Sequence, residues 1–223
     1  MSMVDPKCAK CPERPCTQGL PKGVPLPQDC PIKHHARLIK RTLPLYRGKE
    51  TRGFYLAAAL TEKEGYDAKA AREEGRTVPV RPRIREVAEF AKIVGAEKIG
   101  LAFCSGLYDE AGRAALLLEK HGLEVVSVIC SCGAADKTAV GIPAEDKIRD
   151  PGQFEAACNP LVQAEILNIS GTAFNILVGL CVGHDMLFTA HSKAPVTTLI
   201  VKDRLTGHNP LVSLYTRYHR DIV

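Results

Sequence analysis

Tryptophan is absent from this 223-residue sequence, and aromatic residues make up only 5% of it. Proteins that bind single-stranded nucleic acid stack bases on aromatic side chains, and this sequence offers little material for that. The formal net charge of +5 also falls short of the clustered basicity of a dedicated nucleic-acid binder. The arginines between residues 72 and 85 are interspersed with glutamates, which is typical of a solvated face. We therefore expect no nucleic-acid partner.

Long hydrophobic runs are missing as well. The longest apolar stretches, such as residues 174–182, are far shorter than the ~20 residues that cross a bilayer. The first residues, MSMVDPKCAK, lack the basic segment and apolar run of a secretory signal. Neither G-x-G-x-x-G nor G-x-x-x-x-G-K-S/T occurs, so no motif supports a nucleotide site. These absences predict a soluble, cytoplasmic protein with no membrane partner.

The second half of the sequence has the pattern of an α/β domain. Short, continuous apolar runs suit strands buried on both faces of a parallel sheet, and they occur at residues 98–104, 124–130, 175–181 and 197–202. Helical patterns at 109–121 and 160–169 separate the first three runs. The alternation predicts a doubly wound, mostly parallel sheet of about four strands in a Rossmann-like domain over residues 97–223.

The first half predicts two further regions. Residues 32–96 contain helical patterns at 32–47, 51–64 and 83–94, and we expect this helical region to pack on the core. Residues 1–31 show no periodicity and hold seven of the 15 prolines, so they cannot form a core of their own. Something else must order this segment.

Nine cysteines, an odd number without an export signal, indicate reduced thiols rather than disulfides. The first group is Cys8, Cys11, Cys16 and Cys30, in the spacing C-x2-C-x4-C-x13-C. Two thiolates separated by two residues can bind one metal from a single turn, and a metal would supply the missing ordering energy. Cys11 and Cys30 each precede a proline, as is common around iron–sulfur clusters. Unligated thiols in a flexible leader are the alternative.

Zinc is the alternative metal for this first group. Structural zinc sites usually combine two short Cys-x2-Cys pairs, whereas this segment has one pair and two single cysteines. His34 and His35, just after Cys30, keep a mixed zinc site open.

A second group consists of cysteines at the ends of the predicted strands. Carboxyl ends of parallel strands line one edge, where ligands of open α/β sheets bind. We expect Cys104, Cys132 and Cys181 to meet there, joined by Cys158, which precedes a predicted helix. Cys130 is in phase with the apolar side of its strand, so we assign it to the core. Burial as structural cysteine is the alternative for the whole group.

Two polar segments could also contribute to this edge. His184 and Asp185 open a predicted helix and could act in acid–base catalysis or support a metal ligand. Alternatively, Asp185 caps the helix and His184 is a surface residue. Residues 202–210 either border the crevice and bind an anionic group or form a polar turn.

The sequence resembles domain-of-unknown-function family 1847 of bacteria and archaea, a cysteine-rich group described as metal-binding. The resemblance covers nearly the whole chain and is carried by residues 8–11 (CAKC), 104–107 (CSGL), 130–133 (CSCG), 158–160 (CNP), 179–185 (GLCVGHD) and 193–204 (KAPVTTLIVKDR). It implies metal binding but no reaction.

Together these observations predict a cysteine-ligated metal-binding protein with one or two iron–sulfur clusters, for example of the four-iron, four-sulfur type. A site at the sheet edge could serve as a redox centre or a Lewis acid for a small molecule. The first alternative is a zinc protein with a structural metal and no catalysis. The second is a thiol enzyme or small-molecule binder that uses Cys104 or Cys132 as nucleophile. Substrate, redox partner, oligomeric state and enzymatic activity are left open by the residues.

Overall fold

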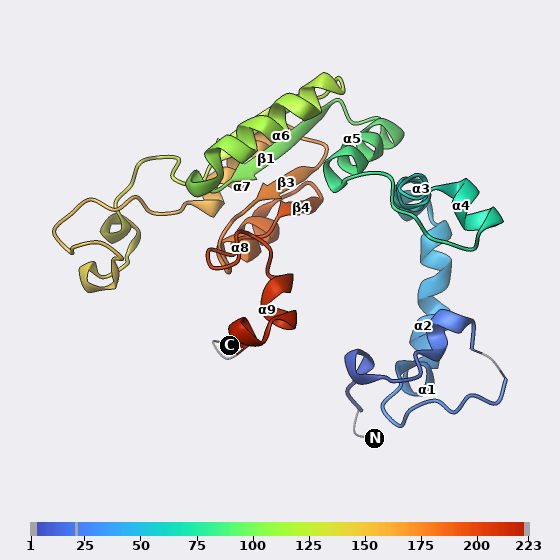
Figure 1. Ribbon diagram of the computed structural model, residues 1–223. Coiled ribbons are helices and arrows are strands. Elements are labelled where there is room, and N and C mark those ends of the chain that lie inside the picture. Colours follow the sequence, from blue (N-terminus) through green and yellow to red (C-terminus); the bar gives the residue numbers. More distant parts are fainter. Residues whose placement is uncertain (1–3, 21, 221–223) are drawn as a thin grey trace. The chain divides into compact units, whose positions relative to one another are not determined.

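The computed structural model describes residues 4–20 and 22–220 (Figure 1). The chain divides into two compact units, one up to Leu60 and one from Thr61 onward, and each is described by itself. The division predicted at residues 31 and 96 stays a prediction. Among the described residues, no helix is both long and apolar enough to span a membrane.

The second unit contains the predicted parallel sheet. Its strands are β1 (Lys98–Phe103), β2 (Glu124–Ile129), β3 (Asn175–Val178) and β4 (Val196–Ile200), in the order β2-β1-β3-β4 with every pairing parallel. The two central strands are buried almost throughout, because helices cover both faces of the sheet. The α/β fold class expected from the apolar runs is confirmed.

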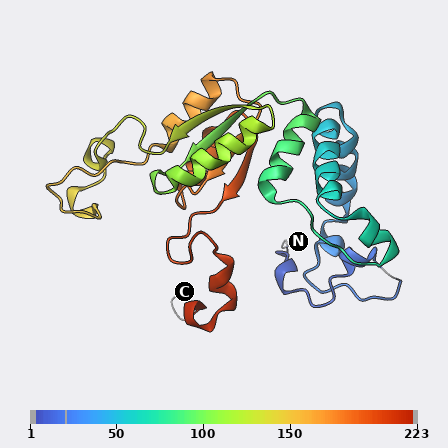
Figure 2. The same ribbon diagram turned by 45° about the horizontal axis from the view of Figure 1, so that its top comes forward.

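Helices lie on both faces of the sheet (Figures 1 and 2), and one apolar cluster packs on each face. On one face, α5 (Arg83–Val94) and α6 (Tyr108–Lys120) contribute Ala91 and Leu118 to the core. On the other face, α7 (Pro160–Ile169) and α8 (His184–His191) contribute Leu167 and Phe188. The helices predicted at 83–94 and 160–169 form with those bounds.

The order of the strands gives the sheet a topological switch point between β1 and β3, where successive strands are added on opposite sides of β1. From β1 the chain passes through α6 to β2 on one side, and later returns to β3 on the other side of β1. In open α/β sheets the carboxyl ends of the strands at such a point leave a crevice that binds ligands. The second cysteine group follows these strand ends.

The strand β3 is shorter than predicted. It ends at Val178 because Gly179 adopts a left-handed conformation with φ +65°, which turns the chain out of the sheet. Cys181 therefore lies three residues beyond the strand, and the backbone N–H of Gly179 still donates to the Ile200 carbonyl of β4 at 2.8 Å.

The first unit is helical but has almost no interior. Its elements are two 3-10 turns (Cys8–Lys10 and Pro15–Gln18), α1 (Pro31–His34), α2 (Ala36–Thr42), a 3-10 segment (Leu43–Arg47) and α3 (Lys49–Glu64), which continues into the second unit. Among its described residues, Pro15 and Ala57 are the buried ones. The segment up to residue 31 thus lacks a core, as expected.

The continuous helix predicted over residues 32–47 was wrong. His35, with φ −118° and ψ 22°, separates α1 from α2, and the turn before Gly48 is a 3-10 helix. Pro44 lies in that turn, and its missing N–H and its ring disfavour a continuing α-helix. The short helix α4 (Ala68–Glu73) follows α3 and begins with Asp67 as its N-cap.

Candidate functional site

Three cysteines follow the strand ends at the switch point. Cys104 comes directly after β1, Cys130 directly after β2, and Cys181 after the turn that ends β3. Phe103 pairs with Ile129, so the parallel register places Cys104 and Cys130 at equivalent positions on neighbouring strands. Both are buried, at 8% and 3% exposure.

Cys130 is the centre of the thiol contacts. Its side chain lies beside those of Cys104 and Cys158 and shifts the pKa of each, and its own thiol donates to Ser105 Oγ at 3.8 Å. Cys158 also lies within electrostatic range of Cys104 and Cys181. We call Cys104, Cys130, Cys158 and Cys181 the strand-edge thiols.

Residues 131–159 form a long connection between β2 and α7, which we call the excursion. Its two ends are hydrogen-bonded to each other, and this brings Cys158 to the edge of the sheet. An antiparallel bridge joins Asp136 to Ala156, and the Ala157 N–H donates to the Ala135 carbonyl at 2.9 Å. The Asn159 N–H then donates to the Cys130 carbonyl at 2.7 Å. Figure 1 shows the excursion, drawn in yellow, extending away from the strands between these ends.

One carboxylate organises the excursion. Asp136 accepts hydrogen bonds from the Thr138 N–H (2.9 Å) and the Glu155 N–H (2.8 Å), and it pairs with the ammonium of Lys147 at 2.8 Å. The Lys147 side chain is 5% exposed, so its charge depends on this partner. The Lys147 ion pair, followed by the Glu155 and Thr138 N–H groups, holds the pKa of Asp136 well below its usual range.

Replacing Asp136 with Asn should therefore loosen the excursion. The amide cannot balance the buried charge of Lys147, and we expect faster hydrogen exchange of backbone amides 133–158 at neutral pH. Because the folded-state pKa is depressed, the wild-type carboxylate stabilises the excursion above the ordinary Asp pKa of about 3.9. That contribution is lost as the pH falls below this value. Hydrogen exchange measured at pH 7 and at a pH below about 3, each corrected for the intrinsic exchange rate, tests both expectations.

Asp150→Asn is the matched control, since the Asp150 carboxylate lies in the same excursion and accepts one bond, from the Gly152 N–H at 2.9 Å. Equal exchange rates for the two variants would contradict the central role of Asp136.

The pKa values of two strand-edge thiols move in opposite directions. The hydrogen bond with Cys130, together with burial, raises the pKa of Cys104 to about 12, against the opposing effects of the Gly106 N–H and Lys202. The hydrogen bond with Cys130 lowers the pKa of Cys158. The same central thiol thus favours the protonated form of one neighbour and the thiolate of the other.

Nitrogen donors approach three of the four sulfurs. The Ser105 N–H donates to Cys130 Sγ at 3.3 Å. The Gly106 N–H and the Lys202 ammonium lie close to Cys104 and oppose the rise in its pKa. The guanidinium of Arg204 donates through Nη2 to Cys181 Sγ at 2.9 Å. Such donors stabilise negative charge on sulfur.

A buried amide holds two strand ends together below the thiols. Gln163 of α7 is fully buried, and its Nε2 donates to the Phe103 carbonyl at 3.2 Å and to the Val128 carbonyl at 2.7 Å. These carbonyls belong to the ends of β1 and β2, just before Cys104 and Cys130. The sequence offered one signal for this role, a polar residue within the apolar pattern of a helix.

Cys132, which we expected at this edge, is placed differently from Cys130. It is partly buried and, like Cys158, packs against the apolar cluster that contains Cys104 and Cys130, so it lies at the predicted edge. Cys130 differs from Cys132 in that it shifts the pKa values of Cys104 and Cys158 and receives the Ser105 N–H at 3.3 Å. The contacts favour Cys130 as the ligand candidate after β2.

His184 and Asp185 open helix α8, as predicted. The Asp185 carboxylate accepts hydrogen bonds from the Gly183 N–H at 3.0 Å and the Met186 N–H at 2.8 Å, which matches the capping alternative. His184 is partly buried, and its Nδ1 has no hydrogen-bond partner among the described residues.

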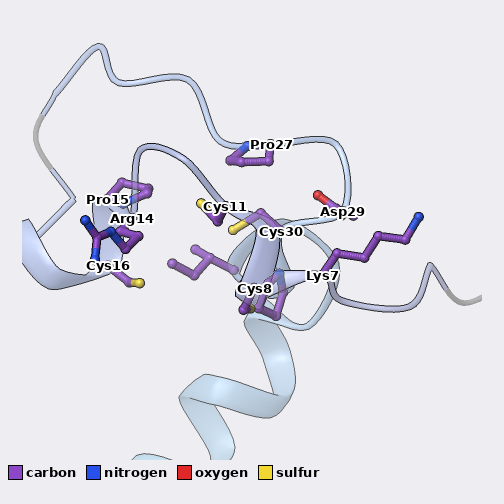
Figure 3. Close-up of a pocket in the computed structure, with 11 residues that line it drawn as sticks. Lys7, Cys8, Cys11, Arg14, Pro15, Cys16, Pro27, Asp29 and Cys30 are labelled. Carbon is purple, nitrogen blue, oxygen red and sulfur yellow. The ribbon is translucent and has the colours of Figure 1, made fainter. Parts of the chain in front are cut away.

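The four N-terminal cysteines line a single pocket in the first unit (Figure 3). Its wall consists of Lys7, Cys8, Cys11, Arg14, Pro15, Cys16, Pro27, Asp29, Cys30, Pro31 and Ile32. Arg14, with φ 44°, is left-handed and begins the turn that carries Cys16. His34 hydrogen-bonds the Gln28 carbonyl through Nε2 at 2.5 Å and is not among the residues that line the pocket. His35 lies between α1 and α2.

The donor sets of both groups fit a thiophilic metal, since four cysteines are the ligand set of zinc sites and of iron–sulfur clusters. As they stand, no three His, Cys, Asp or Glu side chains in the described residues are grouped so that they could hold a metal ion. In either group the sulfurs would have to draw together around a metal.

Comparison with known proteins shows the family of the chain. The profile of DUF1847, described as proteins of unknown function, matches residues 30–199, which include Cys30 and all five cysteines of the second unit. An uncharacterised protein of Methanocaldococcus jannaschii is 38% identical over 213 residues, covering 96% of this chain and 95% of the relative. The chain therefore belongs to the DUF1847 family.

Proposed function

We propose that this protein binds iron–sulfur clusters through cysteine and presents one of them to a small molecule at the carboxyl edge of the sheet. In this proposal Cys104, Cys130, Cys158 and Cys181 hold the functional cluster, with Cys130 taking the role that the sequence pattern gave to Cys132. Cys8, Cys11, Cys16 and Cys30 hold a second metal.

The observation that carries the proposal is the set of N–H groups directed at the strand-edge sulfurs. A neutral buried thiol needs few donors, whereas a metal-bound thiolate keeps negative charge that donors stabilise. Here Cys104, Cys130 and Cys181 each receive a donor, from Gly106, Ser105 and Arg204 respectively. Their position at the switch point of the sheet, where small ligands bind in this fold class, is the second support.

When bound, an iron–sulfur cluster supplies electron transfer, or Lewis acidity where one iron keeps an open position. The chain's own residues perform the remaining tasks. Gln163 fixes the ends of β1 and β2, and the apolar cluster around Leu180 and Phe188 keeps water from the inner side. Lys202 and Arg204 approach Cys104 and Cys181 from the outer side and favour negative charge on these two sulfurs.

The N-terminal group has a structural role in this proposal. Its segment has a single buried residue, Pro15, among the described residues up to position 31, so a metal would contribute most of the ordering free energy. Four thiols around one pocket match this requirement.

Anaerobic purification followed by iron, zinc and acid-labile sulfide analysis tests the proposal. We expect a brown protein with iron and sulfide in equal amounts and broad visible absorption. Cys181→Ser should remove the strand-edge part of the iron, and Cys16→Ser the N-terminal part. A protein that contains neither iron nor sulfide would contradict the proposal.

Zinc is a second candidate for the N-terminal pocket alone. The observation in its favour is the four-cysteine wall in a segment without a core, which is the usual setting of a structural zinc site. Stoichiometric zinc that is lost in Cys16→Ser but retained in Cys181→Ser would establish this assignment.

A further inference from the structure

We propose that Lys202 and Arg204 form a binding site for a small oxyanion, a carboxylate or phosphate group, beside the strand-edge thiols. This inference rests on the proposed function in one respect, because it names the class of small molecule presented to that centre. The two cations come from the segment that follows β4, and each reaches a different thiol, Cys104 for Lys202 and Cys181 for Arg204. They therefore flank the switch point between β1 and β3.

The positive charge of this pair is not balanced by nearby carboxylates. Among the described residues, neither Lys202 nor Arg204 forms an ion pair with an acidic side chain. The carboxylate between them, Asp203, accepts from the backbone N–H groups of Leu205 and Thr206, both at 3.0 Å. Its charge is engaged in the turn, where the neighbouring Thr206 hydroxyl, followed by the backbone N–H groups, lowers its pKa.

The turn after β4 fixes the position of Arg204. Besides the two bonds to Asp203, the Asp203 N–H donates to Nδ1 of His208 at 3.1 Å, and the His208 N–H donates to the Asp203 carbonyl at 2.8 Å. The backbone of His208 is left-handed, with φ 66°. A closed turn of this kind presents the guanidinium without the entropy cost of ordering a free loop.

Both cations keep donors for a ligand. A guanidinium has five N–H groups, and Arg204 uses one of them on Cys181. Arg204 is exposed and Lys202 half-buried, so an anion can approach from solvent. The remaining fork of Arg204 suits a carboxylate or phosphate in bidentate geometry, and the ammonium of Lys202 supplies a point charge. Through Lys202 and Arg204, the turn at residues 202–210 thus provides an anion-binding site.

Titration of the anaerobically purified full-length protein with inorganic phosphate and, separately, with malonate tests this site. Calorimetry at constant ionic strength, maintained with sodium chloride, separates specific binding from screening. We expect saturable binding of at least one probe, weakened roughly tenfold or more in Arg204→Gln and in Lys202→Gln. The preferred probe shows whether the ligand group is a phosphate or a carboxylate.

Two variants serve as controls. Arg113→Gln removes an exposed arginine of α6 and should leave binding unchanged. Arg204→Lys keeps the charge but not the fork and should bind with intermediate affinity, which keeps the test valid if Arg204→Gln is unstable. Absence of saturable binding, or equal weakening in Arg113→Gln, would overturn the inference. Iron and sulfide analysis of the same samples separates the two proposals, since anion binding without iron contradicts the proposed function alone.

Discussion

Replacing Cys130 with Ser should abolish metal binding at the strand-edge thiols, whereas replacing Cys132 with Ser should leave it intact. Cys130 contacts both Cys104 and Cys158 and receives the Ser105 N–H, so its loss removes a ligand and separates its two neighbours. Loss of one ligand should exceed the 10–100-fold effect typical of supporting residues. Iron and sulfide content after anaerobic purification measures the difference.

The N-terminal cysteines provide the internal reference for this pair of variants. Both variants should retain the metal bound by the group that includes Cys16. Cys130→Ser should unfold at a lower temperature than Cys132→Ser, because it loses the bound metal and places a hydroxyl in the apolar cluster. Full iron content in Cys130→Ser together with loss in Cys132→Ser would show that Cys132, as predicted from the sequence, is the ligand.

The strands were predictable because helices bury both faces of the sheet. Residues 98–104 form a run without polar alternation, and in the structure β1 has no exposed residue. The exact ends were less predictable. Gly179 ends β3 by adopting a positive φ. Because glycine adopts negative φ values as readily, its presence in the sequence did not show that the strand would end there.

The composition of the thiol site could be predicted only in part. Strand ends predicted Cys104 and Cys181 at one edge, and strand phase correctly assigned Cys130 to the core, where it is 3% exposed and packs with Val128. Cys130 lies one residue beyond β2, where the register with β1 decides its neighbours. That register is a long-range property that a single sequence does not reveal. Cys158 likewise depends on the bridge between Asp136 and Ala156, which joins residues 20 positions apart.

The first unit shows where a helical pattern of apolar residues fails to predict a continuous helix. The apolar positions 32, 36, 39 and 43 suggest one helical face, yet Ile39 and Leu43 are exposed. A helix gains most of its stability from packing that face against a core. Without such a core, local features such as Pro44 determine where the helix breaks.

Gly179→Ala should destabilise the second unit by about 2–5 kcal/mol and disturb the strand-edge thiols. Gly179 has φ +65°, where an L-residue costs about 1–2 kcal/mol, and a Cβ there would lie 1.9 Å from Leu107 Cδ1. Leu107 is 3% exposed and belongs to the core, so its side chain cannot move aside freely. Chemical denaturation measures the free energy of unfolding, and iron content reports on the site.

Gly122→Ala separates the two causes, because Gly122 has φ +86° but no atom within 4 Å of the added Cβ. This control should show the backbone cost alone and keep its iron. Leu107 ends the turn that follows Cys104, and Gly179 precedes Cys181 by two residues, so the overlap displaces both sides of the switch point at once. Equal destabilisation of the two variants would mean that Leu107 yields without cost and that the close approach of Gly179 does not position the thiols.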